Sequence, residues 1–161
     1  MLTLSRTDSS NQDFQALVLL LDADLRIRDG EDHAYYAQFN KIDLIQHVVV
    51  AYVGNQAVGC GAFKPYAENA VEIKRMFVRP EFRGQQIAQQ VLAALEAWAN
   101  ELHATRCILE TGHKQPEAIR LYQGSGYERI TNYGQYAGVE NSVCMQKIFR
   151  SKSHNESNSI S

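Results

Sequence analysis

The fold of this chain is decided by one stretch, residues 71–98, with the sequence VEIKRMFVRPEFRGQQIAQQVLAALEAW. Its first part, residues 71–78, is dense in Val, Ile, Met and Phe over the length of a strand, and Pro80 ends that strand because proline cannot extend a ladder. From Gly84 onward, apolar residues recur at spacings of three and four, which predicts an amphipathic helix. The apolar stripe consists of Ile87, Val91, Leu95, Trp98 and Leu102. The stretch therefore predicts a strand, a short basic turn and a long helix with one face against a core.

The start of this helix is a candidate binding site for phosphate groups. The first turn of a helix leaves backbone N–H groups unpaired, and the helix dipole makes that end positive. Arg83 adds a fixed positive charge, and Gly84 lets a ligand approach the main chain. We expect Arg83 and the amides from Gly84 to Ala88 to hold a pyrophosphate; an ordinary glycine-capped turn is the alternative. The Rossmann and Walker glycine spacings are absent from this stretch, which argues against those two nucleotide sites.

At these residues the sequence resembles the GNAT superfamily, the acyl-CoA-dependent N-acyltransferases. The family signature, Arg or Gln followed by x-x-Gly-x-Gly or Ala, is matched at its ends by Arg83 and Ala88. The chain has Gln86 where the family usually has its central glycine. Residues 72–78 resemble the family's fourth strand, and residues 115–127, QPEAIRLYQGSGY, resemble its late helix. These matches cover most of the chain between positions 71 and 127.

β-Branched segments predict a sheet through the middle of the chain. Residues 47–53 and 58–63 are joined by Gly54-Asn55, a pair that tolerates positive φ and predicts a hairpin. With residues 71–78 they predict an antiparallel meander. Residues 105–110 follow the long helix, and two strands connected through one helix normally lie parallel. The other expected strands are residues 1–4, 127–130 and 142–149.

Three further helices are expected beside the long one. Ser10, with Asp13 three residues on, is a candidate N-cap for a helix that ends at Gly30. A shorter helix over residues 31–39 carries aromatic side chains that either pack beneath it or wall an acceptor pocket. Pro116 suits the first turn of the last helix. The prediction is therefore an α/β mixed sheet of the GNAT type, mostly antiparallel, with one parallel strand pair at the cofactor cleft and about four helices.

Length and composition predict one domain without external support. With 161 residues, 45% of them hydrophobic, the chain can bury a core without disulfides or metal. A net charge of −2 gives no reason to expect nucleic acid or an anionic membrane as partner, and the longest apolar run, residues 16–21, is far below the ~20 residues that span a bilayer. We therefore expect a cytoplasmic N-acetyltransferase domain over residues 1–150, as a monomer or a homodimer, and a disordered polar tail over 151–161.

The cysteines and histidines predict neither a disulfide framework nor a metal site. Cys60, Cys107 and Cys144 are odd in number and lie inside apolar runs, which is typical of reduced core thiols. The five histidines include no H-x-x-x-H pair, so no metal is expected.

Two side chains are candidates for the proton transfers of acetylation. An amine that attacks a thioester must lose a proton, and the departing thiolate needs one. Glu72, a carboxylate in an otherwise apolar strand, is the candidate general base; the alternative is an ion pair with Lys74 or Arg75. The resemblance implies that Tyr122, on the late helix, is the general acid, whereas simple packing beside Leu121 is the alternative.

The resemblance also implies how acetyl-CoA is held. Backbone groups of Met76 to Val78 would run along the pantetheine arm like an extra strand, and one N–H would polarise the thioester carbonyl. Gln115, where the family commonly has Asn, would hydrogen-bond the same arm. The implied cofactor residues are Met76, Phe77, Val78, Arg83, Gly84, Gln85, Gln86, Ile87, Ala88 and Gln115.

The function expected from these residues is transfer of an acetyl group from acetyl-CoA to a primary amine by direct attack in a ternary complex. Lys74, Arg75 and Arg79 form a cationic cluster that Glu72 alone cannot neutralise, which favours a small-molecule acceptor such as an amino acid or related carboxylated amine. A polyamine or a protein lysine is the alternative acceptor. A module that binds acyl-CoA without turnover is the alternative function.

Overall fold

The computed structural model describes residues 1–29 and 44–149 and contains one seven-stranded sheet of order β1-β2-β3-β4-β5-β7-β6. The strands are β1 (Leu2–Thr7), β2 (His47–Val53), β3 (Gln56–Ala67), β4 (Ala70–Val78), β5 (Arg106–Gly112), β6 (Glu128–Ile130) and β7 (Ser142–Ile148). The α-helices are α1 (Gln12–Asp29), α3 (Ile87–Glu101) and α4 (Pro116–Gly124), and the 3-10 turns are η2 (Pro80–Phe82) and η3 (Gly134–Tyr136). Neighbouring strands are antiparallel except β4 and β5, which confirms the predicted mixed sheet with one parallel pair. The helix expected over residues 31–39 lies outside the described residues.

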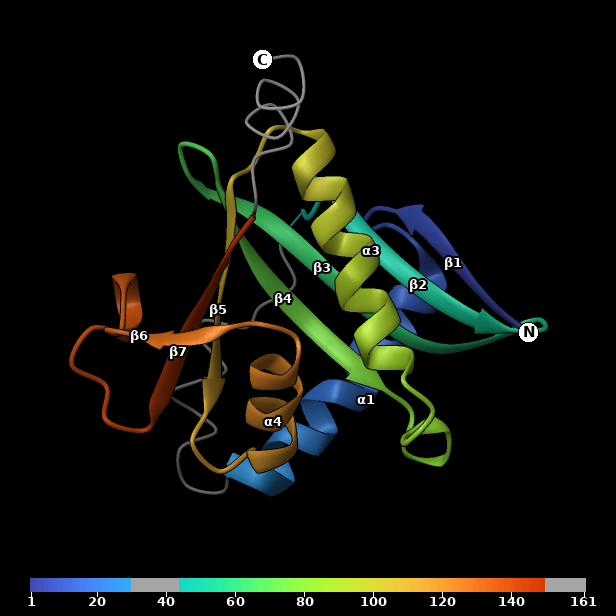
Figure 1. Cartoon of the computed structure of the whole chain (residues 1–161). Coiled ribbons are helices and arrows are strands. Elements are labelled where there is room, and N and C mark those ends of the chain that lie inside the picture. Colours follow the sequence, from blue (N-terminus) through green and yellow to red (C-terminus); the bar gives the residue numbers. More distant parts are fainter. Residues whose placement is uncertain (30–43, 150–161) are drawn as a thin grey trace, which may run out of the picture.

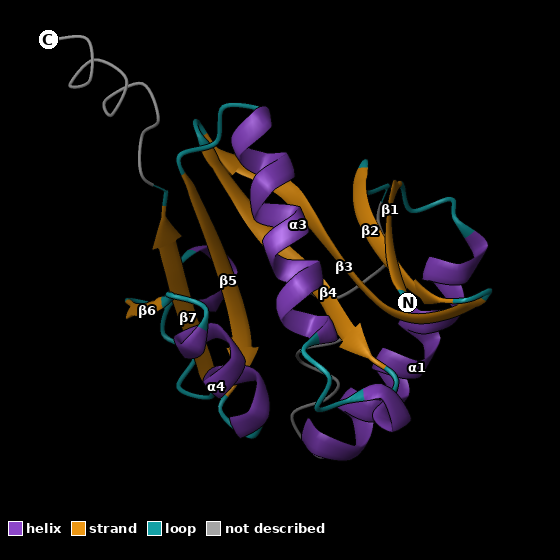
Figure 2. Cartoon of the chain, turned by 45° about the vertical axis from the view of Figure 1, so that its right-hand side comes forward, coloured by secondary structure: helices purple, strands orange, loops and turns teal. Residues whose placement is uncertain are grey.

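Helices cover both faces of the sheet. Figures 1 and 2 show α3 and α4 on one face and α1 on the other. Strand β2 serves both layers because alternate side chains point to opposite faces: Val49 packs in the α3 layer, and Val48 and Val50 pack in the α1 layer. The buried stripe of α3 comprises Ile87, Val91, Leu92, Leu95 and Ala99. The buried stripe of α1 comprises Phe14, Leu17, Val18 and Leu21.

The parallel pair at the centre of the sheet is short. Its ladder runs only from Ala70–Glu72 on β4 to Arg106–Ile108 on β5. Beyond these residues the two strands separate toward their carboxyl ends, as Figure 2 shows. The α-helices that follow each strand, α3 and α4, therefore begin on either side of the separation.

A bulge in β4 lies in the separated part. The register between β3 and β4 shifts opposite Gly61, and Arg75 takes the left-handed conformation with φ 60°. A Cβ atom at Gly61 would lie 2.5 Å from Met76 Sδ, so glycine leaves room there for the Met76 side chain. Because of the extra residue, Lys74 and Arg75 both project toward the α1 side, whereas Met76 packs against the α3 core.

Two predictions about helix ends were wrong. The side chain that caps α1 is Asn11, whose Oδ1 accepts the Phe14 N–H at 2.9 Å, because the Ser10 hydroxyl donates to Asp8 instead. At the other end of the long helix, Leu102 lies beyond the last turn and is 50% exposed. His103 follows it with φ 72°, a left-handed residue that turns the chain away from the core.

The three cysteines are free and buried, as predicted. Within residues 1–29 and 44–149, none of the helices combines the length and the apolar character needed to cross a membrane.

Candidate active site

Two adjoining cavities open where β4 and β5 separate. The larger one has a volume of about 420 Å³ and lies at the start of α3. The smaller one, about 100 Å³, lies between β4, β5, α1 and α4. The side chains common to both walls are Leu21, Met76, Gln115, Ala118 and Tyr122. A molecule in the larger cavity can therefore present one end to the smaller cavity beside Tyr122.

The larger cavity collects the residues that the sequence predicted for the cofactor. Every one of them except Gln85 lines it: Met76, Phe77, Val78, Arg83, Gly84, Gln86, Ile87, Ala88 and Gln115. Sequence reasoning missed the walls from α1 and α4, which are Leu21, Asp24, Glu117, Ala118 and Leu121. Their only signal was their place on amphipathic helices, which does not say which cavity a residue faces.

The start of α3 differs from the prediction. The helix begins at Ile87 rather than at Gly84, and the intervening residues form a loop. Both Gly84, with φ 81°, and Gln86, with φ 63° and ψ 22°, are left-handed. Gln86 is the N-cap but makes no side-chain capping bond. At the position where the family usually has glycine, the backbone thus has a left-handed conformation. Glycine adopts this conformation without strain, whereas glutamine does not.

Arg83 is fixed beside the larger cavity by neighbours from two elements. Its Nε donates to the Val78 carbonyl at 2.9 Å, and its Nη2 lies 3.8 Å from Asp24 Oδ2 on α1. Its guanidinium also lies 5.5 Å from the centre of the Phe77 ring. These contacts orient a cation at the mouth of the cavity, next to the first turn of α3.

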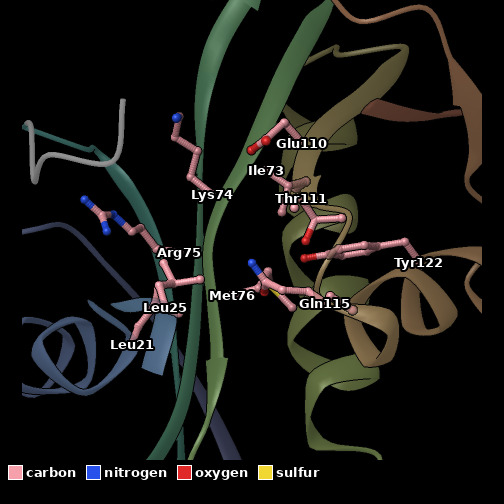
Figure 3. Close-up of a pocket in the computed structure, with 12 residues that line it drawn as sticks. Leu21, Leu25, Ile73, Lys74, Arg75, Met76, Glu110, Thr111, Gln115 and Tyr122 are labelled. Atoms are coloured by element: carbon pink, nitrogen blue, oxygen red, sulfur yellow. The ribbon is translucent and has the colours of Figure 1, made fainter. Parts of the chain in front are cut away.

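Tyr122 projects from α4 into the separation between the strands. Figure 3 shows its hydroxyl beside Thr111 and Gln115, pointing toward β4. The side chain is buried, and the Tyr127 ring packs edge-on at 5.8 Å. Burial, with a smaller contribution from the Glu110 carboxylate, raises the pKa of Tyr122 above its ordinary value. The phenol therefore keeps its proton at neutral pH and is able to donate it.

The structure places two carboxylates near the separation. Glu72 is buried and accepts a hydrogen bond from the Tyr133 hydroxyl at 2.7 Å, and its other oxygen lies 3.7 Å from Lys74 Nζ. Glu72 lines neither cavity, whereas Glu110 lines the smaller one together with Lys74 and Tyr122. Sequence reasoning missed Glu110, although a carboxylate after three apolar strand residues is the same signal that singled out Glu72.

The cations that the sequence placed in one cluster are held by different elements. Arg75 Nη1 lies 3.1 Å from Asp22 Oδ1 on α1, and its side chain is only 4% exposed. Arg79 Nε donates to the Ala57 carbonyl at 2.8 Å. Lys74 and Arg75 are thus paired with carboxylates, Glu72 and Asp22, whereas Arg79 is held by a neutral carbonyl. Figure 3 shows the Arg75 guanidinium pointing away from Tyr122.

Comparison with known proteins points to one family. The acetyltransferase (GNAT) family matches residues 14–127. Among curated proteins, the chain is similar to an IAA acetyltransferase from Azospirillum brasilense, with 36% identity over 100 residues, and the match covers 62% of this chain and 65% of that relative. N-acetyltransferase family 8 member 2 from Rattus norvegicus is 34% identical over 89 residues, and 39% of it is covered. The chain thus spans less than two thirds of these relatives.

Solved structures share the fold over nearly the whole chain. A protein from Klebsiella pneumoniae subsp. pneumoniae that is considered an acyl-CoA N-acyltransferase has a TM-score of 0.78 at 30% identity, covering 93% of this chain and 99% of that one. The PaiA N-acetyltransferase from Thermoplasma acidophilum, solved with coenzyme A, has a TM-score of 0.69 at 15% identity, covering 92% and 99%.

Proposed function

This chain belongs to the acetyltransferase (GNAT) family, and we propose that it transfers an acetyl group from acetyl-CoA to a primary amine of a small molecule. The observation that carries the proposal is the pair of adjoining cavities that share Tyr122 in their walls. One cavity has the size and lining for a cofactor arm, and the other has ionisable side chains for an acceptor. Their junction is where the two substrates would react.

The larger cavity suits acetyl-CoA. Its volume of about 420 Å³ falls within the range of small-molecule sites, roughly 300–1,000 Å³. Phosphate groups would lie at the start of α3, where Arg83 and the first amides of the helix supply positive charge and N–H donors. The pantetheine arm would follow Met76 to Val78, a part of β4 that has no ladder partner on β5. Gln115 and Ala118 would close the opposite wall.

The chemistry needs a proton acceptor and a proton donor at the junction. The free amine attacks the acetyl carbonyl carbon, a C–N bond forms and the C–S bond breaks in a ternary complex. Tyr122 would give its phenolic proton to the leaving thiolate, which its protonated state at neutral pH allows. Among the described residues, Glu72 and Glu110 are our candidates to take the proton of the ammonium group.

The acceptor is proposed to be a compact amine. An amino acid or related carboxylated amine is the first candidate because Lys74 and Thr111 line the smaller cavity and can pair with a carboxylate. A polyamine is the second candidate because Glu110 lines the same cavity and attracts a second positive charge. The small volume of about 100 Å³ favours either over a protein side chain carried on a bulky backbone.

A thiol-release assay tests the proposal. Amino acids, polyamines, aminoglycosides and lysine peptides would each be supplied with acetyl-CoA, and free coenzyme A would be measured. We expect release that depends on the amine. Cofactor binding without release from any amine would instead support an acyl-CoA-binding module. A preference for polyamines over every carboxylated amine would rule out the first candidate acceptor.

A further inference from the structure

The candidate carboxylates Glu72 and Glu110 lie at different positions along the separating strands. In the parallel ladder, Glu72 is level with Ile108, where β4 and β5 are still paired. Glu110 is two residues further along β5, which is about 7 Å at strand rise, and lies where the strands have parted. Tyr122 and the start of α3 are at that same open end. Glu72 therefore lies in the closed part of the sheet and Glu110 in the open part.

The contacts of Glu72 tie it to the loop that contains η3. Tyr133 donates its hydroxyl to Glu72 at 2.7 Å, and the Tyr133 ring packs edge-on against Tyr66 and Tyr136, at 5.0 and 5.7 Å. Asn132 fastens the same loop by donating to the Val139 and Ser142 carbonyls. The Glu72 carboxylate thus contacts the tyrosine cluster through Tyr133 on one side and Lys74 on the other.

Glu110 faces the reaction space instead. Its neighbour Leu109 packs in the α3 core, so Glu110 projects to the opposite face, where it lines the smaller cavity. Figure 3 shows the Glu110 carboxylate and the Tyr122 hydroxyl both pointing toward β4 from the same side of the separation. A proton acceptor and a proton donor therefore border one space.

We infer that Glu110, rather than Glu72, accepts the proton of the attacking amine, and that Glu72 is a positioning residue that acts through Tyr133 and Lys74. The inference rests on the proposed acetyltransferase function. Glu110 removes one proton from the ammonium group and releases it to solvent. The amine nitrogen bonds to the acetyl carbon, the thiolate leaves with the proton of Tyr122, and the Tyr122 phenolate recovers a proton from the new amide nitrogen. The products are the amide, coenzyme A and one proton.

Several ionisable groups surround Glu110 among the described residues. Lys74 approaches from β4, Tyr122 from α4 and Tyr136 from η3, whereas the Arg75 guanidinium points away toward Asp22. Cys144 on β7 is the fourth group, and burial raises its pKa to about 11. The pKa values of Tyr122 and Tyr136 are raised by burial first and by Glu110 second. Near neutral pH these tyrosines and the cysteine stay protonated, so none of them is able to accept the proton of the amine.

The test compares Glu110→Gln with Glu72→Gln under one assay. We expect Glu110→Gln to lower kcat/KM at pH 7 by about 100-fold or more, as loss of a general base does. Its remaining rate should keep rising with pH as the amine deprotonates, and its acetyl-CoA affinity should be unchanged. Glu72→Gln should lose less than about 10-fold, a loss that Tyr133→Phe reproduces and that the double variant does not increase, because the two residues act as one unit. Glu128→Gln, an exposed carboxylate on β6, is the matched control and should behave as wild type.

Opposite results would overturn the inference. A larger loss of kcat/KM in Glu72→Gln than in Glu110→Gln would assign the base to Glu72 on β4. Glu110→Asp guards against a folding defect: it keeps the carboxylate at shorter reach and should fall between Glu110→Gln and wild type. If the wild-type enzyme is active and Glu110→Gln has the same kcat/KM, the inference is overturned while the proposed function stands. A wild type that binds acetyl-CoA but acetylates no amine would overturn the proposed function as well.

Discussion

The cofactor side and the acceptor side of β4 are built in different ways. The cofactor side draws on one short stretch, Met76 to Ala88, in which backbone conformation and a single cation provide most of the proposed contacts. The acceptor side joins Asp22, Glu72, Glu110 and Tyr133, which come from α1, β4, β5 and the loop of η3. A cofactor common to a family can be held by a contiguous segment, whereas an acceptor site depends on side chains that only the completed fold brings together.

The strongest test of the cofactor side is Gly84→Glu. Gly84 has φ 81° with open space around it, so a side chain there suffers strain and also places a carboxylate beside the proposed phosphates. We expect acetyl-CoA affinity to fall by about 100-fold, or about 2.7 kcal/mol. The measurement is the rise in Tm on adding acetyl-CoA, which for wild type should correspond to ~2.7 kcal/mol at 100 times Kd.

Gly54→Glu is the matched control for this change. Gly54 also has positive φ, 60°, and open surroundings, but it lies in the turn between β2 and β3. The control should lower the Tm of the free protein and keep the full response to acetyl-CoA. A full response in Gly84→Glu would mean that the contiguous segment does not hold the cofactor.

The junction of the two sides is tested by Tyr122→Phe. Loss of the phenol should lower kcat by about 100-fold, the usual size of a general-acid effect, and leave acetyl-CoA affinity unchanged. Tyr127→Phe is the control, because the two rings are in contact and the Tyr127 hydroxyl donates to Glu96 at 2.9 Å instead. It should cost about 1 kcal/mol of stability and retain kcat. Equal kcat values in the two variants would refute the donor role of Tyr122.

A smaller effect is expected from Gln86→Gly. Relief of the left-handed strain, less the extra flexibility of glycine in the unfolded chain, should stabilise the protein by roughly 0.5–1 kcal/mol. The corresponding rise in Tm is about 2 °C for a chain of this size. His103→Gly, which relaxes φ 72° at the opposite end of α3, should give a similar rise. Only Gln86→Gly should change acetyl-CoA affinity. Equal affinity in both variants would show that Gln86 does not contribute to cofactor binding.

Near neutral pH, the buried ionisable groups on both sides should make the same, constant contribution to stability. Burial raises the pKa of Tyr122 on the cofactor side and of Tyr133 on the acceptor side, and it raises that of the Cys60 thiol from 9.0 to about 12. A raised pKa in the folded state contributes stability that is complete below the unfolded value and is lost as pH rises above it. We therefore expect a constant contribution between pH 7 and 8 and a falling Tm above about pH 9–10, measured by thermal unfolding. A Tm that stays level to pH 11 would show that folding does not raise the pKa values of these groups.

The cofactor side could be predicted from the sequence more completely than the acceptor side. The strand, turn and helix of the cofactor side were readable because hydrophobic period, Pro80 and Gly84 act locally. The left-handed Gln86 was not readable, since glutamine carries no local preference for that conformation. The position of Glu110 depends on where β4 and β5 part, and the partner of Arg75 lies 53 residues away on α1. No local pattern encodes either contact.

The short ladder between β4 and β5 has a consequence for the protein without its cofactor. Beyond Glu72, the described part of β4 presents a free edge in the middle of the sheet rather than at its border. An unpaired edge is a template on which another extended chain can add, and this is a common route to aggregation. An extended pantetheine arm would cover that edge. The acetyl-CoA concentration would then set how much of the protein is protected from self-association, and depletion of acetyl-CoA would be the condition under which aggregates begin to form.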